Sequence, residues 1–218
     1  MAVSTSTSPR RAVFLDKDGT LIENVPDNVD VERIRFARGA ERAVPRLAAA
    51  GFAIAVVSNQ PGVARGLFDE AAVAAVGHAM TNRLAALGVG LAGFYYCPHH
   101  PAGAVERYRR VCECRKPAPG LLERAARELD IDLAASWLIG DILDDVEAGR
   151  RAGCRTILID AGNETEWRMS SARLPHHVAA DLDDAADLIL ALEARRRSDA
   201  AAPAGSQSAS AGANGARR

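Results

Sequence analysis

The chain has 218 residues, 48% of them hydrophobic and 25% charged, a composition that supports one folded domain of ordinary size. Its 27 basic and 28 acidic residues give a net charge of −1, so there is no electrostatic reason to expect a nucleic acid or an acidic membrane as partner. No run approaches the roughly 20 apolar residues of a membrane span, and the first residues lack a signal-peptide core, so we expect a cytoplasmic protein.

The two ends differ in composition from the rest. Residues 1–10 are rich in Ser, Thr and Pro, and residues 197–218 consist mainly of Ala, Gly, Ser and Arg, with almost nothing to bury. We expect both ends to be disordered, which leaves one folded domain over residues 11–196.

Within this domain, short apolar runs alternate with amphipathic stretches. The predicted strands are Ala12–Leu15, Phe52–Val57, Gly93–Tyr96, Ser136–Ile139, Thr156–Ile159 and a weaker one near Val178. The predicted helices are Gly39–Ala49, Asp69–Leu87, Pro119–Leu129, Asp144–Arg151 and Ala185–Arg195. Continuous apolar strands separated by helices favour an α/β fold, a Rossmann-like parallel sheet doubly wound by helices. In such sheets, ligands bind beyond the carboxyl ends of the strands.

Two carboxylates follow the first predicted strand, in the sequence Asp-Lys-Asp-Gly-Thr. Asp16 and Asp18 are two residues apart, so their charges repel, and a divalent cation is the usual means of keeping both ionised. A carboxylate also attacks phosphorus to form an acyl-phosphate, which water then cleaves. Two similar pairs, beginning at Asp130 and Asp181, precede helices, where capping explains them. The position of Asp16 directly after an apolar strand therefore favours a function in catalysis.

The second predicted strand leads into the sequence Ser-Asn-Gln-Pro-Gly-Val-Ala-Arg-Gly. Ser58 and Asn59 supply polar side chains there, while Gly62 and Gly66 allow the backbone to approach an anion closely. Arg65 is suited to contact a phosphate oxygen. The same residues also suit an ordinary loop between a strand and a helix.

Two further polar groups lie at the ends of predicted elements. Lys116 precedes a helix, where the macrodipole favours an anion, so its position makes sense if a bound phosphate supplies the negative charge. Asp141 directly follows the fourth predicted strand, whereas Asp145, one turn into the next helix, is explained as an N-terminal helix residue. We expect Lys116 and Asp141 to converge with the polar groups after the first two strands.

The motifs Asp-Lys-Asp-Gly-Thr and Gly-Asp-Ile-Leu-Asp-Asp, with the serine and the lysine between them, resemble those of the haloacid dehalogenase superfamily of phosphohydrolases over essentially the whole domain. The resemblance implies a magnesium-dependent phosphatase with Asp16 as nucleophile and Asp18 as general acid and base. It implies a Mg²⁺ site formed by Asp16, the backbone carbonyl of Asp18, and Asp141. It also implies that Ser58 and Lys116 bind the transferring phosphoryl group.

Residues 97–117 match neither a helical nor a strand period and hold three of the four cysteines. The candidate metal ligands, two on each side of a twelve-residue spacer, are Cys97, His99, Cys112 and Cys114. Three thiolates and one imidazole form the tetrahedral set of structural zinc, with His100 as the alternative to His99. Short-lived disulfides compete with this interpretation, although a Cys-x-Cys pair is poorly placed to bridge itself. Since four protein ligands leave no open position, we expect zinc to order the loop, including Arg115 and Lys116.

The two halves of this loop, Cys-Pro-His-His-Pro and Cys-Glu-Cys-Arg-Lys-Pro, together with Gly-Val-Ala-Arg-Gly, resemble those of heptose bisphosphate 7-phosphatases, and histidinol-phosphatases carry a similar loop. The resemblance implies hydrolysis of the 7-phosphate of a heptose 1,7-bisphosphate, with Asn59, Arg65 and Arg115 at the substrate. We expect a small phosphorylated sugar as ligand, a monomer, and a zinc loop in place of a large cap domain.

Two alternatives stay open. A phosphatase for histidinol phosphate or another small sugar phosphate is the alternative within the same class, and an inactive zinc-bearing scaffold is the alternative outside it. A scaffold has no need of the crowded charges around Asp16. Two departures from the family pattern bear on the substrate: Ile142 stands where a polar residue usually follows the motif aspartate, and residues 23–38 lack an expected Gly-Tyr.

Overall fold

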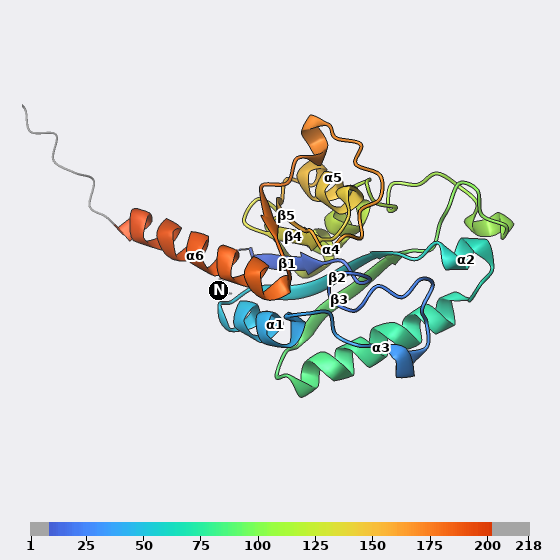
Figure 1. Ribbon diagram of the computed structural model, residues 1–218, viewed down its shortest axis with the longest axis horizontal. Coiled ribbons are helices and arrows are strands. Elements are labelled where there is room, and N and C mark those ends of the chain that lie inside the picture. The colour runs from blue at the N-terminus through green and yellow to red at the C-terminus, as the bar shows by residue number, and fades with distance from the viewer. Residues whose placement is uncertain (1–8, 202–218) are drawn as a thin grey trace, which may run out of the picture.

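The computed structural model describes residues 9–201, which form one sheet covered by helices on both faces (Figure 1). The strands are β1 (Ala12–Leu15), β2 (Ala53–Asn59), β3 (Leu91–Cys97), β4 (Trp137–Gly140), β5 (Arg155–Ile159) and β6 (His177–Ala179). The helices are α1 (Ala40–Ala49), α2 (Gly62–Arg65), α3 (Glu70–Ala86), α4 (Gly120–Leu129), α5 (Leu143–Arg151) and α6 (Leu182–Ala201). The strand order is β3-β2-β1-β4-β5-β6, and every pair is parallel.

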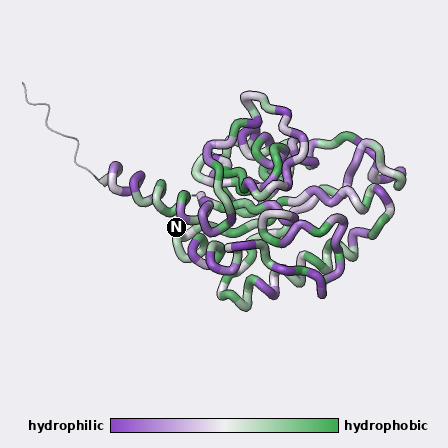
Figure 2. Tube along the Cα trace, viewed as in Figure 1, coloured by the Kyte–Doolittle hydropathy of each residue, from purple (hydrophilic) through white to green (hydrophobic). Residues whose placement is uncertain are grey.

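The central strands carry apolar side chains on both faces of the sheet, so helices must pack on both faces. Every residue of β1 and β4 is buried. One core packs α1, α3 and α6 against the sheet, and a second packs α4 and part of α5 against the opposite face. Figure 2 shows hydrophobic residues gathered along these central strands. Parallel strands buried on both faces account for the continuous apolar runs of the sequence.

The predicted doubly wound parallel sheet is confirmed, and no cap domain is present within residues 9–201. One helix, α2, was not predicted, because four residues are too few for a helical period to be visible. None of the helices in the described range is long and apolar enough to cross a membrane.

Helix α6 runs to Ala201 and so enters the segment, 197–218, for which composition predicts disorder. Its Ala and Arg residues have high helix propensity and continue a helix whose first half packs on α1. The remainder of the two predicted disordered ends, residues 1–8 and 202–218, lies outside the described residues.

The strand order places the site. Connections from β1 lead to one side of the sheet and connections from β4 to the other, so a crevice forms between their carboxyl ends. Asp16 follows β1 and Asp141 follows β4, and the backbone N–H of Asp16 donates to the carbonyl oxygen of Ile139 at 3.0 Å. The two aspartates are thereby fixed side by side by the sheet itself.

Candidate active site

Three carboxylates meet where the strand order reverses. One oxygen each of Asp16, Asp141 and Asp145 lies within 4.8 Å of the others. All three residues are buried, with exposed fractions of 7%, 4% and 1%. Burial, followed by the charges of Asp16 and Asp145, raises the pKa of Asp141 to about 8. This three-carboxylate cluster is therefore short of positive charge.

Lys116 supplies part of the compensating charge. Its Nζ contacts the Asp16 carboxylate, lies 2.5 Å from Asp145 Oδ1 and donates to the carbonyl oxygen of Val57 at 3.0 Å. Burial would lower the pKa of Lys116, but the charges of Asp145 and Asp16 raise it overall, so the ammonium stays protonated. Lys116 therefore lies together with Asp16 and Asp141, as the strand ends predicted.

Glycine at two positions allows the carboxylates to approach so closely. Gly19 has φ +83°, and a Cβ there would lie 2.0 Å from Asp141 Oδ2. A Cβ at Gly140 would lie 2.2 Å from the Cβ of Asp145. Thr20, next to Gly19, donates from Oγ1 to Asp141 Oδ1 at 3.3 Å. The Asp-Gly-Thr and Gly-Asp sequences thus serve the geometry of the cluster.

Asp18 has its own set of partners. Lys17 Nζ donates to Oδ1 of Asp18 at 2.8 Å, and Gln60 Nε2 donates to Oδ2 at 3.1 Å. Burial is the largest cause that raises the pKa of Asp18; the Lys17 charge opposes it and the Asp16 charge adds to it. A carboxyl group with a raised pKa beside the nucleophile candidate is suited to exchange a proton.

Ser58 and Asn59, the last residues of β2, contact different groups. Ser58 Oγ accepts from Gln60 Nε2 at 2.9 Å, so its own proton remains for another acceptor. Asn59 donates from Nδ2 to the carbonyl oxygen of Lys116 and accepts from the Lys116 N–H, both at 3.0 Å. Asn59 therefore holds the backbone of Lys116 in place. The position of Asn59 at a strand end does not by itself predict this role.

A pocket of about 220 Å³ opens beside Asp18. Its lining residues come from the loop after β1 and from the β2–α2 connection, and they are Asp18, Asn24, Val25, Pro26, Asp27, Asn59, Gln60, Pro61 and Arg65. Arg65 Nη1 lies 3.9 Å from a carboxylate oxygen of Asp27. The segment 23–38, which departs from the family pattern, therefore forms one wall of the pocket next to Asp18.

The four candidate zinc ligands also converge. The sulfur atoms of Cys97, Cys112 and Cys114 are 3.1–3.5 Å apart, and His99 Nδ1 lies 3.3 Å from Cys114 Sγ. Four donors around a zinc ion would be about 3.8 Å apart for bonds of about 2.3 Å, close to these spacings. His100 instead accepts from the Ala102 N–H at 3.1 Å, so His99 is the histidine that joins the cluster.

This Cys/His loop is fastened to the helices beside the pocket. The Val105 N–H donates to the carbonyl oxygen of Ala64 in α2 at 2.9 Å. Glu70, at the start of α3, accepts from the hydroxyls of Tyr96 and Tyr108 at 2.7 and 2.5 Å. The loop is therefore held to the same elements that carry Arg65.

Two arginines bring positive charge to this region. Burial, followed by the charges of Arg115 and Arg65, lowers the pKa of His100. Arg115 Nη1 is buried and has no hydrogen-bond partner among residues 9–201. Arg115 thus retains a donor for an anionic ligand.

Sequence reasoning missed two residues of the site. Asp145 belongs to the three-carboxylate cluster, although the sequence explains it equally well as a helix N-terminus. The Gly-Asp-x-x-x-Asp spacing was the available signal. Gln60 links Asp18 to Ser58, and no local pattern marks it for this position.

Comparisons with known proteins identify the relatives of this chain. A family model described as HAD-hydrolase-like matches residues 113–185. The chain is 41% identical over 177 residues to D-glycero-beta-D-manno-heptose-1,7-bisphosphate 7-phosphatase of Escherichia coli (strain K12), which covers 77% of this chain and 93% of that protein. The crystal structure of D,D-heptose 1,7-bisphosphate phosphatase from B. bronchiseptica, complexed with magnesium and phosphate, matches with a TM-score of 0.69 and 33% identity over 84% of this chain and 99% of that chain. A putative HAD-like phosphatase from Mesorhizobium loti matches with a TM-score of 0.73 and 30% identity over 89% of this chain and 91% of that chain.

A parallel sheet of this order, with a buried lysine and aspartates at its strand ends, defines a phosphatase of the haloacid dehalogenase class. Within that class, the identity and coverage of its relatives show that the chain belongs to the heptose 1,7-bisphosphate 7-phosphatase family.

Proposed function

We propose that this chain hydrolyses the 7-phosphate of D-glycero-D-manno-heptose 1,7-bisphosphate through an aspartyl-phosphate on Asp16. The observation that carries the proposal is the contact of Asp16, at the end of β1, with a buried and protonated Lys116, while Asp18 lies two residues away. The activity in the names of relatives that are about 40% identical supports the substrate.

In the first step, a carboxylate oxygen of Asp16 attacks phosphorus and the bond from phosphorus to the sugar oxygen breaks. Asp18 in its protonated form gives its proton to that leaving oxygen, for which its raised pKa is favourable. Lys116 and the free Ser58 proton stabilise the charge that develops on the phosphoryl oxygens.

In the second step, water attacks the phosphorus of the aspartyl-phosphate. Asp18, now a carboxylate, takes a proton from the water, and the bond from phosphorus to the Asp16 oxygen breaks to release phosphate. Gln60 holds Asp18 and Ser58 in a common arrangement through both steps, because its Nε2 donates to each.

The three-carboxylate cluster fits a hard divalent cation, because three buried carboxylates each offer one oxygen within 4.8 Å of the others, and such oxygens are the ligands that these ions prefer. We assign Asp16, the backbone carbonyl of Asp18, and Asp141 as ligands of Mg²⁺. When bound, the ion supplies positive charge to the transferring phosphoryl group. A related phosphatase complexed with magnesium and phosphate supports the choice of metal.

The Cys/His cluster fits zinc, because three thiolates and one imidazole nitrogen at these spacings are a soft, closed set. We assign Cys97, His99, Cys112 and Cys114 as its ligands and a structural role to the ion. Cys114 lies two residues before Lys116, so the ion fixes the chain that leads into the catalytic site.

The second phosphate of the substrate would serve as a handle. Arg65 lines the pocket beside Asp18, and Arg115 has a buried Nη1 without a hydrogen-bond partner among residues 9–201. Binding energy from a remote phosphate orients the reacting one, so a substrate that lacks it loses rate as well as affinity. This requirement separates a bisphosphate substrate from histidinol phosphate.

The test is phosphate release from a panel of both heptose bisphosphate anomers, heptose 7-phosphate, fructose 1,6-bisphosphate and histidinol phosphate. We expect kcat/KM for heptose bisphosphate to exceed that for heptose 7-phosphate or histidinol phosphate at least ~100-fold, about 2.7 kcal/mol of transition-state binding. Arg115→Ala reduces this ratio, whereas Arg107→Ala, the same charge loss on an exposed face of the loop, leaves it within about threefold.

If kcat/KM for histidinol phosphate were comparable to that for heptose bisphosphate, the heptose assignment would be wrong. The result would favour the alternative, a phosphatase for histidinol phosphate or another small sugar phosphate. An absence of phosphate release from every substrate, with Mg²⁺ present, would favour the inactive scaffold.

A further inference from the structure

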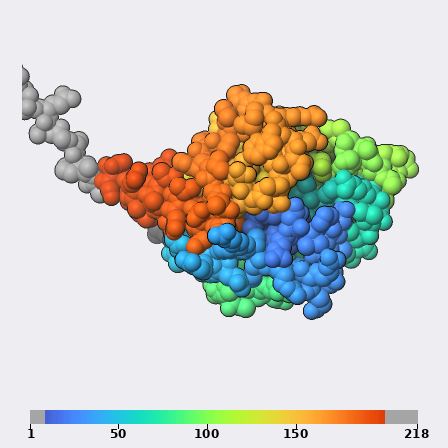
Figure 3. All heavy atoms as spheres, viewed as in Figure 1, coloured from blue at the N-terminus to red at the C-terminus, as the bar shows by residue number. Residues whose placement is uncertain are grey.

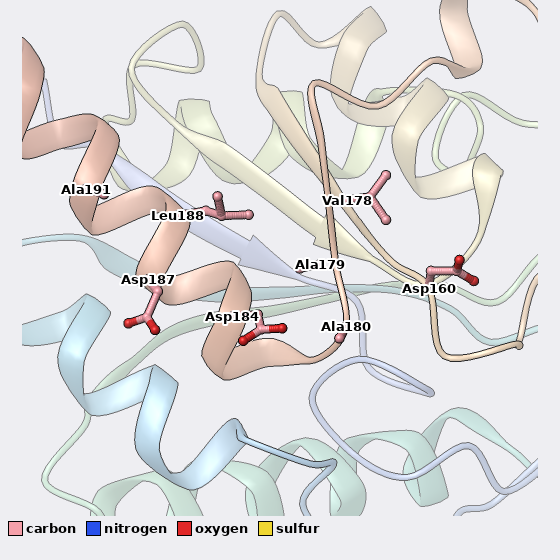
Figure 4. Close-up of a pocket in the computed structure, with 8 residues that line it drawn as sticks. All are labelled: Asp160, Val178, Ala179, Ala180, Asp184, Asp187, Leu188 and Ala191. Carbon is pink, nitrogen blue, oxygen red and sulfur yellow. The ribbon is translucent and has the colours of Figure 1, made fainter.

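The connection from β5 to β6, residues 160–176, lies against the surroundings of the active site. It begins at Asp160, which Figure 4 labels at one end of the groove between β6 and α6. In Figure 3 the orange surface of this connection meets the blue surface of the segment that follows β1. Across this boundary, Asn24 Nδ2 donates to Asn163 Oδ1 at 3.3 Å. Since Asn24 lines the pocket beside Asp18, the connection is joined to one wall of the site.

Glu164, the residue after Asn163, joins the connection to the other side of the site. Its Oε2 accepts from the backbone N–H of Leu143, the first residue of α5, at 2.7 Å. Its Oε1 accepts from the Glu166 N–H at 2.6 Å, so the carboxylate is also held by its own loop. The side chain of Glu164 is thus fixed at both oxygens and pinned to the start of α5.

Helix α5 begins without a polar side chain at its N-cap. The N-cap residue is Ile142, whose φ of −129° and ψ of 160° are the extended conformation usual at this position, but isoleucine has no hydrogen-bond acceptor in its side chain. The first four N–H groups of a helix have no partner within the helix. Asp145 Oδ2 accepts from the Ile142 N–H at 3.3 Å, and Glu164 accepts from the next one, that of Leu143. Glu164 therefore supplies, from a different loop, an acceptor that the N-cap residue lacks.

The start of α5 determines where two of the three clustered carboxylates lie. Asp141 is two residues before Leu143, and Asp145 is in the first turn of the helix. Leu143 is buried, so its N–H would be poorly hydrated if the acceptor were removed, and this turn would be destabilised. Glu164 does not itself belong to the three-carboxylate cluster, so any effect that it has on the cluster acts through α5.

We propose that Glu164 is a positioning residue of the Mg²⁺ site. By capping α5 it fixes Asp141, the assigned ligand, and Asp145, which contacts Lys116, in the arrangement that the ion requires. This inference rests on the Mg²⁺ assignment of the proposed function. Because the partner of Glu164 is a backbone N–H, the role needs an oxygen acceptor and does not need a negative charge.

The test is Mg²⁺ binding to the full chain, measured by isothermal titration calorimetry, with thermal melting of each variant. We expect Glu164→Ala to raise the Kd for Mg²⁺ about tenfold. Glu164→Gln keeps an oxygen acceptor and leaves the Kd within about threefold of wild type. Glu166→Ala is the matched control, because it removes the same group from an exposed position of the same loop, where the carboxylate pairs with Arg168 at 3.3 Å. Its Kd stays within about threefold of wild type.

A second substitution separates positioning from a general loss of stability. Ile142→Ser places a hydroxyl acceptor at the N-cap, and in the Glu164→Ala chain it returns the Kd to within about threefold of wild type. A purely structural role of Glu164 would lower the melting temperature and leave the Kd unchanged. Equal Kd values for wild type and Glu164→Ala, an equal loss in Glu164→Gln, or no recovery with Ile142→Ser each overturns the role of Glu164. A wild-type chain that binds no Mg²⁺ overturns the Mg²⁺ assignment itself and this inference with it.

Discussion

Asp145 offers the sharpest test of the catalytic site, because the sequence alone explains it as a helix N-terminus. Asp145→Asn keeps the shape of the side chain but removes the charge that faces Lys116 Nζ at 2.5 Å and disturbs the acceptor of the Ile142 N–H at 3.3 Å. A hydrogen bond to a charged group contributes about 1.5–3 kcal/mol, and Asp145 is only 1% exposed. Since Lys116 also contacts Asp16, we expect kcat/KM for phosphate release to fall about 10- to 150-fold.

Asp144→Asn is the matched control. Asp144 pairs with Arg173 at 2.6 Å, and 30% of its side chain is exposed, so the pair contributes little to stability. We expect its kcat/KM to stay within about threefold of wild type. Steady-state phosphate release at several Mg²⁺ concentrations, with thermal melting of each variant, measures both effects. An Asp145→Asn enzyme within threefold of wild type, or an equal loss in the two variants, refutes this account of Asp145.

Three further outcomes are expected. Asp16→Asn abolishes turnover with an unchanged circular dichroism spectrum, because an amide does not attack phosphorus; turnover near the wild-type rate would exclude the aspartyl-phosphate. Protein purified without chelator contains one zinc per chain, and the Cys114→Ser variant loses it. The Cys154→Ser variant retains zinc, because Cys154 is a free cysteine outside the Cys/His cluster. Wild-type protein without zinc in metal analysis would contradict this prediction. Gly19→Ala lowers the free energy of unfolding in urea by about 1–3 kcal/mol, because φ is +83° and a carboxylate oxygen lies 2.0 Å from the added Cβ. Gly90→Ala is the control and leaves this free energy unchanged, because its Cβ would enter open space. Equal unfolding midpoints for the two variants would refute the steric reasoning.

Most of the fold was predictable from the sequence because it depends on local signals. The strands are buried on both faces, so each is a short apolar run, and β1 begins and ends at the predicted residues, Ala12–Leu15. Parallel strands carry their functional groups at one edge, so the positions of Asp16 and Asp141 followed from the strand ends. The full length of α6 was not predictable from composition. An Ala- and Arg-rich segment by itself suggests disorder, but the same segment becomes helical when it continues a helix that packs on the protein.

The parts of the site that escaped prediction depend on long-range contacts. Asp145 is buried because Lys116, from a different loop, meets it, and a capping role explained the residue without that contact. Gln60 reaches Asp18 across the carboxyl end of the sheet, from a connection whose path the sequence does not define. The choice of His99 over the adjacent His100, by contrast, agrees with the prediction from the sequence, since His99 is the histidine in the cluster.

The position of the Cys/His cluster has a physical explanation in the absence of a cap domain from the described range. A phosphatase without a closing domain must hold its substrate with loops, and a loop without regular structure loses entropy when it binds. Here the segment around Arg115 is held at both ends, by Cys114 on one side and by the two hydrogen bonds of Asn59 to the Lys116 backbone on the other. We infer that a metal bound at this cluster orders the loop when the protein folds. Arg115 and Lys116 are then already in position before a phosphorylated sugar binds, so binding loses less conformational entropy.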